Sequence, residues 1–171
     1  IDDKYKSDLP DRNAQKESGV IQTITAAPSK VDPNYADPKI RQAISMAIDR
    51  DTIIKQIFNG TRVPATGWVS PVVDGYKAEQ CGEFCKYDPA KAKALLAEAG
   101  YRDGLTVENL GLPQYPELLK TGQVIREHLK AIGIDMQIKP VDVSVWYDAF
   151  VNSTYQITSA YQERSIDPDN F

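Results

Sequence analysis

The sequence has no long apolar segment and very few of the residues that build metal or catalytic centres. No stretch approaches the roughly 18 uninterrupted apolar residues that a membrane-spanning helix needs. The 171 residues include two cysteines and a single histidine, His128, too few ligands for a zinc site of paired Cys and His residues. A glycine-rich phosphate loop and a nucleophile elbow are also absent. We therefore expect no metal site, no cofactor and no enzyme active site.

Concentrated positive charge is missing as well. Twenty basic and 24 acidic residues give a formal net charge of -4, and no run of Lys or Arg forms a phosphate-binding stripe. Nucleic acid is therefore excluded as an expected partner. With 42% hydrophobic and 26% charged residues, the composition is that of an ordinary globular domain. Because the chain lacks an initiator Met and stops directly after a predicted strand, we expect both ends to be interior points of a longer protein.

Three helices are predicted from their start signals. Asp37-Pro38 and Asp88-Pro89 each combine an aspartate that can cap free amides with a proline suited to the first helical position. Asp49 can cap a further helix, which is expected to end at Asn59-Gly60. Gly100 is the predicted stop of the helix that follows Asp88.

The second half of the chain alternates strands and helices. A strand at 105–110, a helix from about 116 to 132 and a strand at 134–139 form a unit whose strands should be parallel neighbours. A short helix at 143–151 and a strand at 155–161 follow. This order predicts an α/β fold with a small, mixed, mostly parallel sheet flanked by helices. We assign residues 1–36 to an extended lead-in and residues 37–171 to the α/β domain.

A long loop at 62–87, rich in proline and glycine, contains both cysteines. The spacing of Cys81 and Cys85 fits either half of a metal site or a disulfide that closes a short ring. His128 has Glu127 and Lys130 as neighbours, and we expect it to be a solvated residue on a polar helix face.

Candidate ligand-binding residues come from the rule that open α/β sheets bind ligands at the carboxyl ends of their strands. Tyr161, Gln162, Glu163 and Arg164 lie at and after the end of the last predicted strand, and an ordinary surface loop is the alternative interpretation. Two further aromatic residues, Trp68 in the long loop and Tyr115, are candidates for the same site.

Four segments resemble, in the same order, the extracytoplasmic solute-binding proteins of the oligopeptide and dipeptide ABC-importer family. They are residues 37–50 (DPKIRQAISMAIDR), 87–100 (YDPAKAKALLAEAG), 125–134 (IREHLKAIGI) and 167–171 (DPDNF). The resemblance implies a periplasmic-binding-protein type II lobe, most of the second lobe of a monomeric clamshell. Such a protein closes on a peptide or related small solute outside the cytoplasmic membrane and delivers it to a membrane permease. It is periplasmic or tethered to the cell surface by lipid, and this setting favours a Cys81–Cys85 disulfide.

The sequence departs from the family pattern beside the last motif. Peptide binders of the family carry a Trp in the strand and, just after it, an Asp that pairs with the α-ammonium group of the peptide. Tyr161 and Arg164 stand at these positions here, so the charge is reversed. Either Glu163 replaces the Asp, or the ligand has no amine at that point. Sugar, opine and metal-complex binders of the same family, a sensory binding module, and a hydrolase using Asp167 and Glu163 remain the alternatives.

Overall fold

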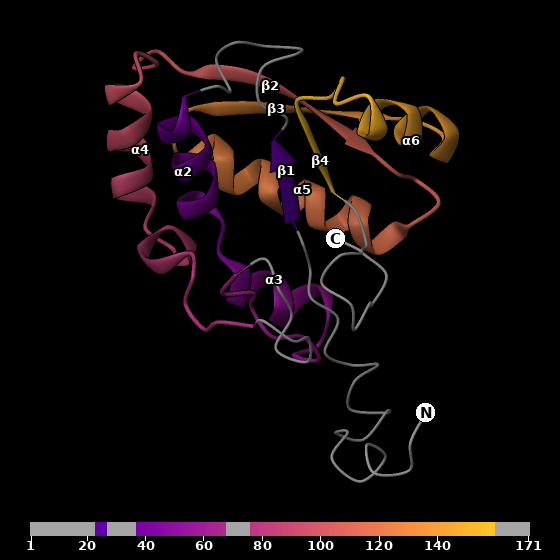
Figure 1. Ribbon diagram of the computed structural model, residues 1–171, viewed down its shortest axis with the longest axis horizontal. Helices are drawn as coiled ribbons and strands as arrows, with labels where there is room; N and C mark the ends of the chain where they lie inside the picture. Colours follow the sequence, from indigo (N-terminus) through magenta and orange to yellow (C-terminus); the bar gives the residue numbers. More distant parts are fainter. Residues whose placement is uncertain (1–22, 27–36, 68–75, 160–171) are drawn as a thin grey trace, which may run out of the picture.

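The computed structural model describes residues 23–26, 37–67 and 76–159. Its elements are β1 (Thr23–Ala26), α2 (Pro38–Ala47), α3 (Arg50–Ile57), the 3-10 turn η3 (Gly82–Cys85), α4 (Pro89–Glu98), β2 (Leu105–Gly111), α5 (Pro116–Ala131), β3 (Ile134–Pro140), α6 (Val143–Val151) and β4 (Ile157–Ser159). Figure 1 shows the helices arranged around the strands. Within these ranges, no helix has both the length and the apolar character needed to cross a membrane.

The three predicted helix starts are confirmed. In α2, α3 and α4 the aspartate before the first turn accepts a hydrogen bond from a backbone N–H two or three residues on. The distances are 2.8 Å for Asp37 and 2.9 Å for Asp49 and Asp88. Each bond satisfies an amide that has no partner inside the helix, so the sequence defines these three boundaries locally.

The strands form one sheet in the order β1-β4-β2-β3. β2 pairs in parallel with both β3 and β4, and β1 pairs antiparallel with β4, which confirms a mixed, mostly parallel sheet. The predicted β2-α5-β3 unit is present, with Leu105 opposite Ile134 and Gly111 opposite Pro140. No strand is predicted before residue 37, so β1 is an element that sequence analysis missed.

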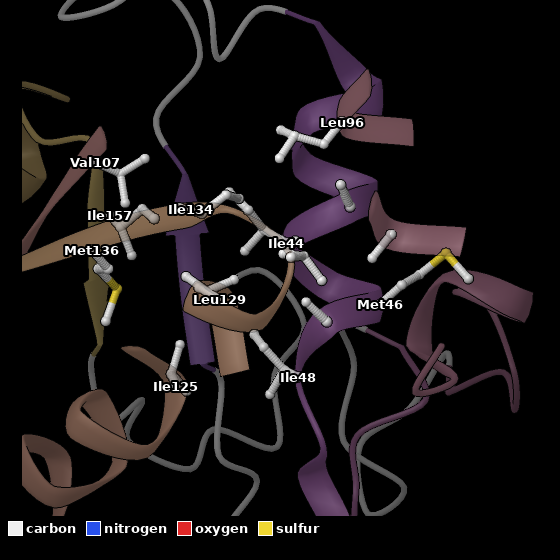
Figure 2. Close-up of a cluster of buried hydrophobic side chains, with 14 of the residues drawn as sticks. Ile44, Met46, Ile48, Leu96, Val107, Ile125, Leu129, Ile134, Met136 and Ile157 are labelled. Carbon is white, nitrogen blue, oxygen red and sulfur yellow. The ribbon is translucent and has the colours of Figure 1, made fainter. Parts of the chain in front are cut away.

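The main core lies on one face of this sheet, between the strands and helices α2, α3, α4 and α5. Asn109 on β2 faces α5, since a Cβ on Gly122 of that helix would come within 3.2 Å of the Asn109 side-chain nitrogen. Because side chains alternate along a strand, Val107 faces the same side. Figure 2 shows part of this core, including Ile44, Ile48, Leu96, Val107, Ile125, Leu129, Ile134, Met136 and Ile157.

Within the described residues, α6 packs against part of the opposite face of the sheet. Leu110 on β2 and the buried Tyr155 form a second, smaller apolar cluster, against which Trp146 and Ala149 of α6 pack. Along β3 the alternate residues on this face, Asp135 and Gln137 among them, are exposed and polar. In the described part of the sheet, the α6 side is therefore apolar around Leu110 near the end of β2 and polar along β3.

Two glycines, Gly104 and Gly133, allow the backbone segments that precede β2 and β3 to approach each other closely at the amino ends of these strands. The Leu105 N–H donates to the Gly133 carbonyl oxygen at 3.1 Å, just where α5 ends and β3 begins. Gly104 has a φ of +104° and Gly133 a φ of +95°, a region that residues with a Cβ rarely adopt. A Cβ on Gly104 would lie 2.7 Å from the Gly133 oxygen. Position 104 thus requires glycine both for its backbone conformation and for the available space.

Candidate functional site

The carboxyl ends of β2 and β4 lie next to each other and define the edge where sequence analysis places the ligand. The two strands are parallel neighbours, and Leu110 stands opposite Thr158 near the end of both. A residue that follows β2 and a residue that follows β4 therefore emerge at the same edge of the sheet. The strand order therefore predicts, for the segment after β4 as for the segment after β2, a place at this edge.

Tyr115 emerges at this edge from a short turn between β2 and α5. Its N–H donates to the Leu112 carbonyl at 3.0 Å, and its own carbonyl accepts from Leu119 N–H at 3.1 Å in the first turn of α5. Leu112 is buried and anchors the turn, whereas the Tyr115 side chain is 42% exposed. The backbone of Tyr115 is thus held in place, and its role as a ligand residue stays a prediction.

The end of β4 is fixed by hydrogen bonds that sequence analysis did not identify. The Thr158 hydroxyl accepts a hydrogen bond from the Trp146 indole N–H at 2.6 Å and donates to the Leu110 carbonyl at 3.2 Å. Thr158 is 1% exposed, so both bonds form in a nearly dry environment, where an unpaired polar group is costly. This chain of bonds links α6, β4 and β2 directly before the segment that should contact the ligand.

The remaining candidate ligand residues lie outside the described residues. Tyr161, Gln162, Glu163 and Arg164 begin two positions after Ser159, the last residue of β4, and Trp68 directly follows the described range 37–67. Their roles therefore stay predictions. Two residues before Trp68, the backbone is anchored, because the Thr66 carbonyl accepts a hydrogen bond from the Cys81 N–H at 3.1 Å.

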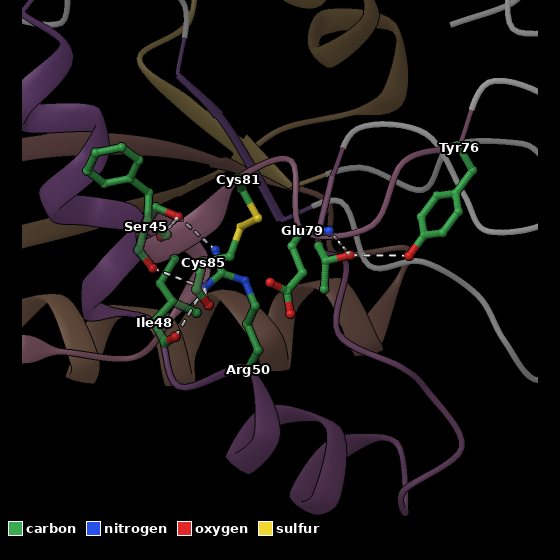
Figure 3. Close-up of a disulfide and its surroundings, with 9 residues drawn as sticks. Ser45, Ile48, Arg50, Tyr76, Glu79, Cys81 and Cys85 are labelled. Atoms are coloured by element: carbon green, nitrogen blue, oxygen red, sulfur yellow. Dashed lines mark hydrogen bonds between the residues drawn. A yellow bond between two sulfur atoms is a disulfide. The ribbon is translucent and has the colours of Figure 1, made fainter.

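The predicted disulfide between Cys81 and Cys85 is present. It closes the η3 turn, with a separation of 5.6 Å between the two Cα atoms, and Figure 3 shows it beside Arg50 and Ser45. η3 contacts α2, at the far side of the molecule from the loop that joins β2 to α5 (Figure 1). The disulfide therefore braces the long loop rather than the carboxyl edge.

A partly buried arginine holds the disulfide turn against the junction of α2 and α3. The Arg50 guanidinium donates to the Ser45 carbonyl at 3.0 Å, to the Ser45 hydroxyl at 2.9 Å and to the Cys85 carbonyl at 3.4 Å. The Ser45 hydroxyl in turn donates to the Phe84 carbonyl at 2.7 Å. Burial lowers the pKa of Arg50. Since all of these acceptors are neutral, the arginine has a structural role in this turn.

The expectation that His128 is a solvated residue is wrong. Its side chain is partly buried, its ring centroid lies 6.2 Å from that of Tyr87, and its buried Nδ1 has no hydrogen-bond partner. Burial lowers the pKa of His128, and the negative charge of Asp49 opposes this shift. Burial acts to raise the pKa of Asp49, but the hydrogen bonds from Thr52 and the charge of His128 leave it lowered. Helix α3 covers this part of α5, an arrangement that the local sequence does not reveal.

Comparison with known proteins gives a consistent set of relatives. The chain is 36% identical over 108 residues to the glutathione-binding protein GsiB of Salmonella choleraesuis (strain SC-B67), which covers 63% of this chain and 20% of that protein. It is 29% identical over 140 residues to the dipeptide-binding protein of Escherichia coli (strain K12), covering 79% of this chain and 26% of that one. Among solved structures, AgaA from A. tumefaciens R10 in complex with agropinic acid has 31% identity and a TM-score of 0.73, covering 85% of this chain and 29% of that one.

The match to a family is more extensive than the match to any of these individual proteins. The chain spans about a fifth to a quarter of the length of the curated relatives described above. By contrast, residues 2–171 match the family described as bacterial extracellular solute-binding proteins, family 5 Middle. The chain belongs to the bacterial extracellular solute-binding proteins of family 5.

Proposed function

We propose that this chain forms most of one lobe of the substrate-binding component of an ABC importer. The lobe comprises residues 37–171 together with β1, which joins its sheet, and the rest of residues 1–36 leads into it from the preceding part of the protein. The complete protein captures a small solute outside the cytoplasmic membrane by clamshell closure and delivers it to a membrane permease. It acts as a monomer and binds its solute without chemical change. Membership of family 5 and the absence of any catalytic motif in the sequence support this proposal.

The observation that carries the proposal is the construction of the carboxyl edge. β2 and β4 end side by side, and the Trp146–Thr158–Leu110 bonds fix the end of β4 before the candidate segment begins. An exposed aromatic ring at Tyr115 stands at the end of the neighbouring strand. A rigid strand end that presents polar and aromatic side chains is suited to binding a solute across a cleft.

The family and the disulfide both support an extracytoplasmic compartment for the protein. Cys81 and Cys85 are bonded, and such bonds persist mainly in oxidising compartments. The protein therefore functions in the periplasm or at the cell surface, where a lipid anchor would hold it.

The proposed solute carries a carboxylate that pairs with Arg164. A guanidinium can hold a carboxylate through two parallel hydrogen bonds, whereas it repels an ammonium group. The ligands named for the relatives differ, being glutathione, dipeptides and agropinic acid, so the family does not specify one ligand chemistry. If the solute is a peptide with a free amine, Glu163 takes the role of its counter-charge.

Native mass spectrometry of the full-length protein should first identify the solute that remains bound through purification. Titration calorimetry with that solute then compares Arg164→Ala and Arg164→Lys with the wild type. Arg102→Ala is the matched control, because Arg102 is exposed and precedes β2, at the opposite edge of the sheet.

Loss of a charged hydrogen-bond pair should weaken binding roughly 10- to 100-fold in Arg164→Ala. Arg164→Lys should recover only part of this loss, and Arg102→Ala should bind normally. Wild-type affinity in Arg164→Ala would remove this residue from the site. Failure of the full-length protein to bind any solute would count against the transport function itself.

A further inference from the structure

The turn that carries the disulfide is also held by hydrogen bonds that do not involve sulfur. The Arg50 guanidinium donates to the Cys85 carbonyl at 3.4 Å. The Ser45 hydroxyl donates to the Phe84 carbonyl at 2.7 Å. Inside the turn, the Phe84 N–H donates to the Cys81 carbonyl at 3.1 Å. Because none of these bonds passes through the two Sγ atoms, the backbone of η3 is held in place when the bond between them opens.

The disulfide adds a short and accessible brace to this turn. Its two cysteines are four residues apart, and closing so small a ring removes little conformational freedom from the unfolded chain. Both cysteines are partly exposed, and Gly82 and Glu83 between them are exposed. Exposed disulfides are the ones that exchange with thiols, whereas buried structural ones resist reduction.

The two sulfur atoms of the disulfide have different electrostatic surroundings. Figure 3 shows the Arg50 guanidinium beside Cys85, to whose carbonyl it donates. Lys86 follows directly in the sequence, and the acidic residue inside the ring, Glu83, pairs with Lys91 at 2.7 Å. A neighbouring positive charge stabilises a thiolate, and a better stabilised thiolate leaves faster in exchange. Of the two cysteines, Cys85 is therefore the better leaving group.

We propose that the Cys81–Cys85 disulfide is a thiol–disulfide exchange site that reversibly takes up a small thiol. The incoming thiolate attacks the Cys81 Sγ and forms a mixed disulfide there. The bond between the two protein sulfurs breaks, and its electron pair leaves with Cys85 as a thiolate. Because η3 keeps its backbone, this thiolate stays close to the mixed disulfide, attacks the Cys81 Sγ and releases the small thiol. The cycle consumes no oxidant or reductant, and it is independent of the proposed solute site.

The test uses the oxidised full-length protein and 2-mercaptoethanol as the small thiol. The reaction runs in native buffer and, as the reference, in urea, and far-UV circular dichroism confirms that the native sample is folded. Acid stops exchange because it protonates the thiolates. Pepsin digestion in the same acid and fragmentation mass spectrometry then locate the adduct on Cys81 or on Cys85.

The proposal expects exchange in the folded protein at a rate within roughly tenfold of the rate in urea. The adduct should lie on Cys81 at least about three times as often as on Cys85. Removing the thiol by gel filtration should restore the disulfide. A native rate below this range would show that the disulfide opens only together with the fold, and it would overturn the proposal. An adduct divided equally, or found mainly on Cys85, would also overturn it.

A pair of charge variants tests the part assigned to Arg50. Arg50→Gln removes the positive charge beside Cys85, and Lys55→Gln removes an exposed charge from α3 as the matched control. In Arg50→Gln the ratio of adduct on the two cysteines should approach one, and in Lys55→Gln it should equal the wild-type ratio. An unchanged ratio in folded Arg50→Gln would refute the role of its charge. The position of the adduct in the wild type tests the proposal even if Arg50→Gln does not fold.

Discussion

The bonds that fix the end of β4 make a quantitative prediction for stability. Replacing Thr158 by Val removes the hydroxyl that bridges the Trp146 indole and the Leu110 carbonyl, while it keeps the β-branched shape. Each of the two hydrogen bonds contributes about 0.5–1.5 kcal/mol, so Thr158→Val should lower the free energy of unfolding by about 1–3 kcal/mol. Trp146→Phe removes one of the two bonds and part of a ring, with an expected loss of about 1–2 kcal/mol.

A double-mutant cycle separates the shared bond from the rest. The Trp146–Thr158 bond is lost in both single variants. The loss in free energy of unfolding in the double variant should therefore be smaller than the sum of the two single losses by about 0.5–1.5 kcal/mol. The measurement is urea unfolding of the 171-residue chain, followed by far-UV circular dichroism. Thr106→Val, at an exposed position of β2, is the control and should change stability by less than about 0.5 kcal/mol. Additivity of the two substitutions within about 0.3 kcal/mol would refute the bonded arrangement.

Two further predictions concern groups that lie away from the carboxyl edge. The pKa of His128 should fall below the ordinary value of 6.5, and further below it in Asp49→Asn, because burial disfavours the charged ring and Asp49 opposes that effect. Because the pKa of His128 is lower in the folded state, the contribution of its neutral ring to the free energy of unfolding is fully present above about pH 6.5. This contribution declines as the pH falls below that value. Proton NMR can follow this single histidine directly, and a midpoint at or above 6.5 would contradict its burial. Gly104→Ala should destabilise the chain by about 1–2 kcal/mol more than Gly100→Ala in the same urea assay, because both sites have positive φ but only position 104 meets a backbone oxygen. Equal losses for the two variants would show that the close approach to Gly133 is absent.

The helices were predictable because their signals are local. Asp37, Asp49 and Asp88 each act on amides within three residues, so sequence alone defines where α2, α3 and α4 begin. The same holds for the disulfide, since Cys81 and Cys85 are four residues apart and the resemblance to an exported family favours oxidation.

The features that sequence analysis missed depend on contacts between distant segments. β1 has four residues, and its pairing partner β4 lies near the other end of the chain, so no local pattern identifies it. The burial of His128 requires contact with Tyr87 and proximity to Asp49, both contributed by other elements. Trp146 and Thr158 are twelve residues apart and meet only because α6 folds back onto the sheet. At the candidate site, sequence identified the strand end but not the bonds that hold it.

The antiparallel pairing of β1 with β4 has a consequence for engineering the lobe. Thr23 stands opposite Ser159, so the chain enters the sheet and leaves it at adjacent points. Neighbouring ends are the geometry that lets a folded unit be inserted into a loop of another protein, or be permuted by a short linker that joins its ends. The unit between these two residues is therefore suited to insertion into a host protein. The junction would then lie beside the carboxyl edge of the sheet. A conformational change at that edge would act directly on the host.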